Sequence, residues 1–153
     1  MPETVSKDQL ADYIDRDMPP SEWLAIEQER IDAFADATLD HQFIHVDKEK
    51  AAQTPFGTTI AHGYLTLSLL PYLTGQCGVI PEGIAMAINY GSNKVRFLQP
   101  VKVGSEVRAH VKLKDVNEKK PGQILTTSEV TVEIRGEEKP ALVAETLALY
   151  FVQ

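Results

Sequence analysis

Apolar and polar positions follow a helical period in the first half of the chain and an alternating period after Gly83. Residues 27–38 repeat apolar side chains every three to four positions among acidic ones, which predicts an amphipathic surface helix. Residues 6–16 predict a shorter amphipathic helix with Ser6 as its N-cap. Residues 23–26 predict a short strand or extended entry between the two helices.

A polar stretch with an acid and two histidines follows the second helix. We expect residues 38–46 to form a loop, because no helical period continues through them. Asp47 is expected to cap one further helical turn over residues 47–53. This turn leads into the apolar centre of the chain.

No Asp, Glu, Lys or Arg occurs between Ala51 and Pro81, although 24% of the chain is charged. An uncharged stretch of this length in an acidic protein is typical of the buried axis of a fold. Within it, residues 61–75 are apolar on nearly every side, which predicts a long central helix enclosed on most sides. Pro71 removes one backbone hydrogen bond, so we expect a kink or an early end there.

The alternating part of the sequence predicts one long strand or two at residues 85–97, and further long strands at residues 106–116, 123–135 and 141–152. Gly91 and Ser92 allow a bulge in the first strand. Basic side chains on the second strand face acidic ones on the third, which predicts adjacent antiparallel strands. The last strand is mostly apolar and is expected to be central in the sheet. Helices followed by such strands predict an α+β domain, with one helix against a strongly curved antiparallel sheet.

Composition limits the class of protein. At 153 residues and 43% hydrophobic, the chain suits one domain over residues 1–153, with residues 1–20 as an N-terminal helical extension. A net charge of −7 and scattered basic residues argue against a nucleic-acid or membrane-surface partner. The apolar runs are too short to span a membrane, and no signal peptide is found. Cys77 is the single cysteine, so we expect a cytoplasmic protein in which it is a small core residue rather than a nucleophile.

His41 and His45 stand four residues apart, a spacing that suggests a metal site on a helix. In the zinc metalloprotease pattern the residue after the first histidine is a catalytic Glu, but here it is Gln42, which cannot act as a base. The flanking sequence also lacks helical continuity. We therefore expect no metal ion at this position.

Asp40 and His45 are the stronger candidates for chemistry. On a helix their side chains would diverge, but on a loop they can converge on one water molecule. A histidine with a near-neutral pKa can take or give a proton at physiological pH, so such a pair forms an acid/base unit. On spacing alone the alternative stays open that Asp40 caps the following turn and His45 only packs.

His62 and Gly63 stand at the expected start of the central helix. The first turn of a helix leaves backbone N–H groups without partners and carries a partial positive charge. Gly63 has no Cβ, so a carbonyl oxygen could approach its N–H as in an oxyanion hole. The alternative is a glycine that allows close packing beneath a strand. We expect His62 to be a positioned, hydrogen-bonded partner rather than a second catalytic group.

Basic residues of the second half could meet the phosphates of a cofactor, namely Lys94, Arg96, Lys102 and Arg108. Such residues are more often solvated charges on strands. The chain also lacks the phosphate-binding glycine loop of either familiar nucleotide-binding kind. We therefore expect these side chains to be solvated rather than to contact a cofactor.

Taken in order, the motifs resemble those of the MaoC-like dehydratases, a hot-dog-fold family that includes (R)-specific enoyl-CoA hydratases. The resemblance rests on two paired segments, Ala37-Thr38-x-Asp40-x-Gln42-x-x-His45-x-Asp47 and Phe56-Gly57 with Ile60-Ala61-His62-Gly63-x-Leu65. A third segment, residues 89–104, is similar to the NodN-like single-domain branch. The resemblance extends over residues 23–152 in order.

The resemblance implies a single hot-dog fold, with a long central helix wrapped by a curved antiparallel sheet, that works as a homodimer. It implies that Asp40 and His45 activate one water molecule and that the Gly63 N–H polarises the thioester carbonyl. It assigns substrate contacts to four residues, Gln42, His62, Tyr64 and Asn93. The substrate would be an acyl-CoA thioester, with acyl carrier protein as the alternative carrier, and no metal or other cofactor would be needed.

The implied reaction is the reversible syn-addition of water to a trans-2-enoyl-CoA, giving (R)-3-hydroxyacyl-CoA in fatty-acid and acyl-thioester metabolism. Two alternatives stay open: a hot-dog acyl-CoA thioesterase, whose water attacks the carbonyl, and a non-catalytic acyl-thioester-binding module. The chain departs from the family at Leu39, where Gly is common, at Gln42, where Asn is usual, and at Pro71, where some hydratases carry Ser. Leu39 is expected to alter the backbone angles of the loop. None of the three removes a group that the reaction needs.

Overall fold

Four long strands and one short strand form an antiparallel sheet in the computed structural model, which describes residues 1–153. They are β2 (Leu24–Ala25), β4 (Ile84–Phe97), β5 (Glu106–Lys120), β6 (Gln123–Ile134) and β7 (Leu142–Val152). Their order across the sheet is β2-β5-β6-β7-β4. The alternating pattern therefore predicted the long strands, although residues 85–97 belong to one strand rather than two and β5 runs four residues beyond its predicted end. Strand β7 has a neighbour on each side, as its apolar sequence indicated.

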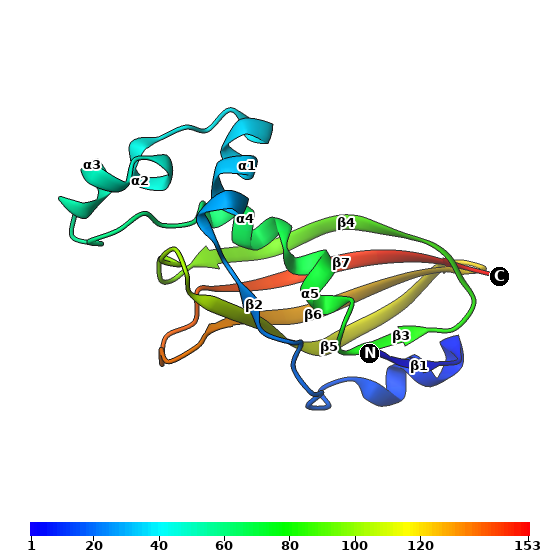
Figure 1. Ribbon diagram of the computed structural model, residues 1–153. Coiled ribbons are helices and arrows are strands. Elements are labelled where there is room, and N and C mark those ends of the chain that lie inside the picture. Colours follow the sequence, from blue (N-terminus) through cyan, green and yellow to red (C-terminus); the bar gives the residue numbers. More distant parts are fainter.

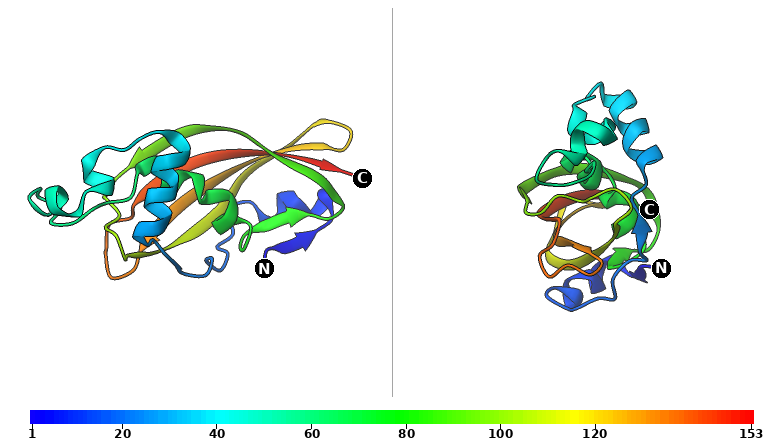
Figure 2. Two further views of the ribbon diagram at one scale, coloured as in Figure 1. Left: turned by 45° about the horizontal axis from the view of Figure 1, so that its top comes forward. Right: turned by 60° about the vertical axis from the view of Figure 1, so that its left-hand side comes forward.

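Helices α4 (Gly63–Ser68) and α5 (Leu70–Thr74) together form the expected central helix. They lie along one face of the sheet, whose strands curl around them (Figures 1 and 2). The helix is interrupted at Leu69, just before Pro71, because a proline has no N–H to donate to the preceding turn. The expected break is therefore confirmed.

The central helix is covered on only one side within a single chain. Leu65, Leu70 and Leu73 are buried in the core that the helix shares with β5, β6 and β7. On the opposite side, Tyr64 and Tyr72 are 69% and 60% exposed. The prediction that the helix is enclosed on most sides is thus wrong for one chain, because the sheet curls over one face only.

Three helices gather near one end of the sheet, and two of them reach beyond it (Figure 1). Helix α1 (Gln28–Thr38) matches the predicted surface helix, and it is followed by α2 (Phe43–Val46) and α3 (Lys48–Ala52). Asp47 caps α3, as predicted, by accepting a backbone N–H at 3.0 Å. Helix α2 was not predicted, because four residues are too few to show a helical period. The segment expected as a loop therefore contains one helical turn.

The N-terminal residues lie toward the other end of the sheet, with the N-terminus beside β3 and the C-terminus at the tip of that end (Figure 1). Ser6 is the N-cap of η1 (Lys7–Tyr13), as predicted, although this helix is of the 3-10 type. Strand β1 (Glu3–Val5) pairs in parallel with β3 (Val79–Pro81). This pair was missed, because two three-residue strands show no alternation. None of the helices combines the length and apolarity that crossing a bilayer requires.

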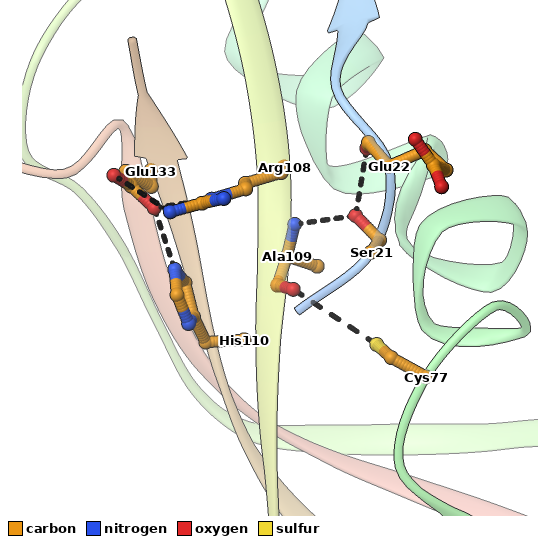
Figure 3. Close-up of polar contacts among 7 residues, drawn as sticks. All are labelled: Ser21, Glu22, Cys77, Arg108, Ala109, His110 and Glu133. Atoms are coloured by element: carbon orange, nitrogen blue, oxygen red, sulfur yellow. Dashed lines mark hydrogen bonds and ion pairs between the residues drawn. The ribbon is translucent and has the colours of Figure 1, made fainter. Parts of the chain in front are cut away.

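Charged side chains pair across β5 and β6 on the outer face of the sheet (Figure 3). Nε of Arg108 donates to Glu133 at 2.7 Å, and Nε2 of His110 lies 2.6 Å from the same carboxylate. The hydrogen bond from Arg108 is the main cause that holds the pKa of Glu133 below its ordinary value. These contacts confirm the antiparallel pairing that the facing charges predicted. On the inner face Cys77 is buried beside Ala109, as expected of a small core residue.

Candidate active site

His45 lies in α2 and is only 7% exposed. Its Nδ1 lies 2.7 Å from the carbonyl oxygen of Ile60. A carbonyl only accepts, so the proton of the neutral ring is assigned to Nδ1, which leaves the Nε2 lone pair available as a base. Burial lowers the pKa of His45 below its ordinary value of 6.5. The ring is therefore neutral at physiological pH.

Asp40 follows α1 after a single residue, Leu39, that bends the chain back. Its carboxylate accepts the backbone N–H of Gln42 at 3.3 Å. Polar atoms of Asp40, His45 and His62 all lie within 4.8 Å of one another. The segment after α1 thus brings together the acid and the histidine that were expected to converge, while their catalytic roles stay a prediction.

His62 packs directly against His45. The two ring centroids are 3.8 Å apart and the ring planes differ by 22°, so the rings are stacked. The three groups have the side-chain chemistry of metal ligands. However, imidazole lone pairs lie in the ring plane, and nearly parallel planes do not converge on one ion. This arrangement suits proton transfer better than cation binding.

His41 takes no part in this cluster. Its Nε2 lies 2.8 Å from the carboxylate of Asp36 on α1, and both side chains are at least half exposed. The structure therefore separates His41 from His45, the two histidines whose spacing suggested a metal site.

Gly63 is the first residue of α4, and its N–H has no acceptor within the chain. The Phe97 ring packs so closely on Gly63 that a Cβ would lie 3.0 Å from it. The close packing expected as one reading of this glycine is therefore present, and the oxyanion role of its N–H stays a prediction. Gly63 and His45 line one cavity of about 260 Å³, together with Thr66, Phe97 and neighbouring residues of the loop 98–101.

A second cavity of about 410 Å³ lies farther along the same helix. Leu67 and Pro71 line it from α4 and α5, four and eight residues beyond Gly63, so all three positions share one helix face. The opposite wall comes from β4 and β7. The two cavities therefore follow one another between the central helix and the sheet.

Three of the residues expected to contact substrate are exposed to solvent or bonded to other side chains in the single chain. The side chain of Gln42 is exposed, and Tyr64 stands edge-on to Phe97 at 5.8 Å between ring centroids. Nδ2 of Asn93 donates to Glu145 at 2.7 Å, and Asn93 lines neither of the two cavities. Substrate contact by these residues remains a prediction.

Two residues that support the site were missed from the sequence. Phe97 covers Gly63, and Gln28 connects α1 to the site. Nε2 of Gln28 donates to the backbone carbonyl of His45 at 2.8 Å, while its Oε1 accepts from the Thr59 hydroxyl at 2.6 Å. No local motif marks such contacts, because they depend on segments distant in the sequence.

Leu39 adopts the left-handed conformation, with φ of 64°, and its side chain is 82% exposed. This conformation costs a non-glycine residue about 1–2 kcal/mol, which glycine would not incur. Glycine also increases the conformational entropy of the unfolded chain, and this offsets part of the stabilisation. We expect Leu39→Gly to raise the free energy of unfolding by about 0.5 kcal/mol, measured by urea denaturation. A lower free energy of unfolding in Leu39→Gly would show that the exposed leucine side chain makes a stabilising contact.

Comparison with known proteins places this geometry in a wider context. The family model described as MaoC like domain matches residues 9–134. The chain is 54% identical over 130 residues to 3-hydroxyacyl-thioester dehydratase Z of Mycobacterium tuberculosis, covering 85% of each protein. It is 47% identical over 137 residues to nodulation protein N of Rhizobium leguminosarum bv. viciae, covering 89% of this chain and 85% of that protein. The solved structure of the (R)-hydratase from A. caviae superimposes with a TM-score of 0.71 and 28% identity, covering 88% of this chain and 94% of that chain. The hot-dog fold expected from the sequence is thereby confirmed.

Proposed function

Because the chain belongs to the MaoC-like dehydratase family, we propose that it is an (R)-specific enoyl-CoA hydratase. The broader activity, that of a hydro-lyase acting on acyl thioesters, follows from its relatives. The finer proposal concerns the enoyl-CoA substrate and the configuration of the product. The observation that carries it is the meeting of Asp40 and His45 beside a cavity that Gly63 also lines.

In the proposed reaction one water molecule is held between Asp40 and His45. Nε2 of His45 accepts a proton from the water while the oxygen adds to the β-carbon of the enoyl thioester. Negative charge develops on the thioester oxygen, where the Gly63 N–H donates a hydrogen bond. A proton then passes from the Asp40–His45 pair to the α-carbon. Because one acid/base pair serves both carbons, both additions occur on the same face.

The proposed chemistry needs no metal or redox cofactor. Water and the substrate supply every atom of the product, and the reaction involves no net oxidation or reduction. Coenzyme A is the proposed carrier, with acyl carrier protein as the alternative, and the cytoplasm is the proposed compartment. The acyl chain is proposed to lie in the second cavity, between Leu67 and Pro71 on the helix and the strands opposite. Rates measured over a series of enoyl-CoA chain lengths will define how long a chain this cavity accepts.

We further propose that two copies of the chain form a homodimer through β4. This strand is at the edge of the sheet and is exposed along nearly its whole length. It presents large apolar side chains, including Met86, Ile88 and Tyr90, and the central helix also exposes Tyr64 and Tyr72. An unpaired apolar edge of this kind is typical of an interface between subunits. Sedimentation equilibrium should give twice the mass of one chain, and a monomer at micromolar concentration would refute this proposal.

Gly63→Ala is expected to lower kcat for enoyl-CoA hydration by about 10-fold or more, because the added methyl group lies beside the proposed oxyanion donor. The methyl group would also press on the Phe97 ring, which must move by a few tenths of an ångström. Steady-state kinetics with crotonyl-CoA measure the effect. The unfolding temperature serves as the control for folding. Full activity in a folded Gly63→Ala protein would remove Gly63 from the mechanism.

One assay separates this function from its alternatives. Crotonyl-CoA is incubated with the protein while the conjugated thioester absorbance and free thiol are followed together. A hydratase removes the absorbance without releasing thiol. A thioesterase releases thiol, and a binding module leaves the substrate unchanged while still retaining it on equilibrium dialysis. Either of the last two results would overturn the proposal.

A further inference from the structure

His62 contacts both members of the proposed catalytic pair, yet the mechanism above gives it no task. It precedes α4 directly and is only 3% exposed. One face of its ring stacks on His45 at 3.8 Å, and the Phe34 ring of α1 lies at 4.9 Å with a tilt of 58°. A side chain enclosed in this way has little freedom to approach a substrate.

The ring has a single hydrogen bond, and that bond goes to Asp40. Nε2 of His62 lies 3.0 Å from the backbone carbonyl oxygen of Asp40, so in the neutral ring this nitrogen carries the proton and donates. Nδ1 is buried and has no partner in the protein. The hydrogen bond therefore connects the start of the central helix to the backbone that holds the catalytic carboxylate.

The stacking contact acts on the other member of the pair. It fixes the plane of the His45 ring, while the Ile60 carbonyl fixes the direction of its Nδ1–H. The titratable groups that act on His45 are His62 and Asp40, and a charge on His62 lowers the pKa of His45 after the larger effect of burial. The nearest polar group from α1, Gln28, is not titratable and binds only the His45 carbonyl.

We propose that His62 is a positioning residue that holds the Asp40 backbone and the His45 ring in their reacting arrangement, rather than a residue that binds substrate. The proposal rests on the hydratase function proposed above. His62 connects the helix that carries Gly63 to the segment that carries the acid/base pair. One buried ring thereby aligns both halves of the site.

Two variants separate the two contacts. His62→Gln retains an amide N–H that can reach the Asp40 carbonyl but lacks the ring, whereas His62→Phe retains a stacking ring but lacks the donor. A misplacement of about 1 Å at a reacting group costs about 100-fold in rate, so we expect kcat to fall by that order in His62→Phe and by about 10-fold in His62→Gln. KM for crotonyl-CoA should stay within about threefold, because no substrate contact is lost.

The titration of His45 gives a second readout that does not require turnover. Both variants remove the group whose charge lowers the pKa of His45, so that pKa should rise, which histidine NMR detects directly. Because His45 must be neutral to act as the base, the acidic limb of the pH–kcat/KM profile, which reports the free enzyme, should move to higher pH by the same amount. His41→Gln is the matched control, since His41 pairs with Asp36 outside the cluster. It should change neither quantity.

A raised KM with unchanged kcat would make His62 a substrate-binding residue and overturn the inference. An unchanged His45 titration in both folded variants would do the same. Failure of the wild-type protein to hydrate crotonyl-CoA would instead refute the proposed function, and the NMR titration would still decide whether His62 acts on His45.

Discussion

Replacing His45 with Gln is expected to lower kcat for crotonyl-CoA hydration by about 1,000-fold, within the range that general acid–base catalysis contributes. Glutamine has a similar length and can occupy the buried site, but it cannot accept a proton from water. The change therefore removes the proposed base while the cavity beside Gly63 remains. Initial rates from the loss of conjugated thioester absorbance measure the effect.

His41→Gln is the matched control for this variant, because it makes the same substitution four residues earlier at an exposed histidine. It should retain the wild-type rate. Equal losses in both variants would indicate general damage to the segment. Full activity in His45→Gln would exclude His45 as the base.

Replacing Asp40 with Asn should also lower kcat, by about 100-fold to 1,000-fold. The amide oxygen can still accept the Gln42 backbone N–H, so the local turn is retained. Asn has no negative charge, however, and only one acceptor oxygen. It can therefore neither hold the water through two oxygens nor stabilise the His45 imidazolium. Asp36→Asn, at an exposed position on α1, serves as the control.

The two substitutions should not be additive. If Asp40 and His45 handle one proton as a unit, the double variant should be about as slow as the slower single variant. Multiplied effects would show that the two residues act in separate steps. That result would contradict the shared-water mechanism even if each single variant were slow.

The elements that could be predicted from the sequence are those in which one local pattern determines the outcome. Alternation over ten or more residues predicted β4 to β7, and the facing charges of Arg108 and Glu133 agreed with the pairing of β5 and β6. The break near Pro71 followed from one missing N–H. Asp40, His45 and Gly63 were identified because their residue types suited one chemistry and their motifs matched one family.

The features that were missed depend on contacts between distant segments. The cover of Phe97 over Gly63 joins residues 34 positions apart, and no local period records it. His62 was expected to be hydrogen-bonded, which is confirmed, but its partner Asp40, 22 positions away, was not identified. Helix α2 and the β1–β3 pair are too short to show a pattern. The exposed side of the central helix was misjudged because apolar residues indicate burial, whether the cover comes from the same chain or from a second copy.

The stereochemistry of hydration in heavy water tests the central claim most directly. Crotonyl-CoA is converted by the wild-type protein in D₂O, and the configuration at both carbons of the product is determined by NMR and chiral analysis. The Asp40–His45 pair is predicted to give (R)-3-hydroxybutyryl-CoA with one deuterium on the α-carbon, on the same face as the new hydroxyl group. An (S)-alcohol, a deuterium on the opposite face, or free coenzyme A without a hydroxyacyl product would contradict it.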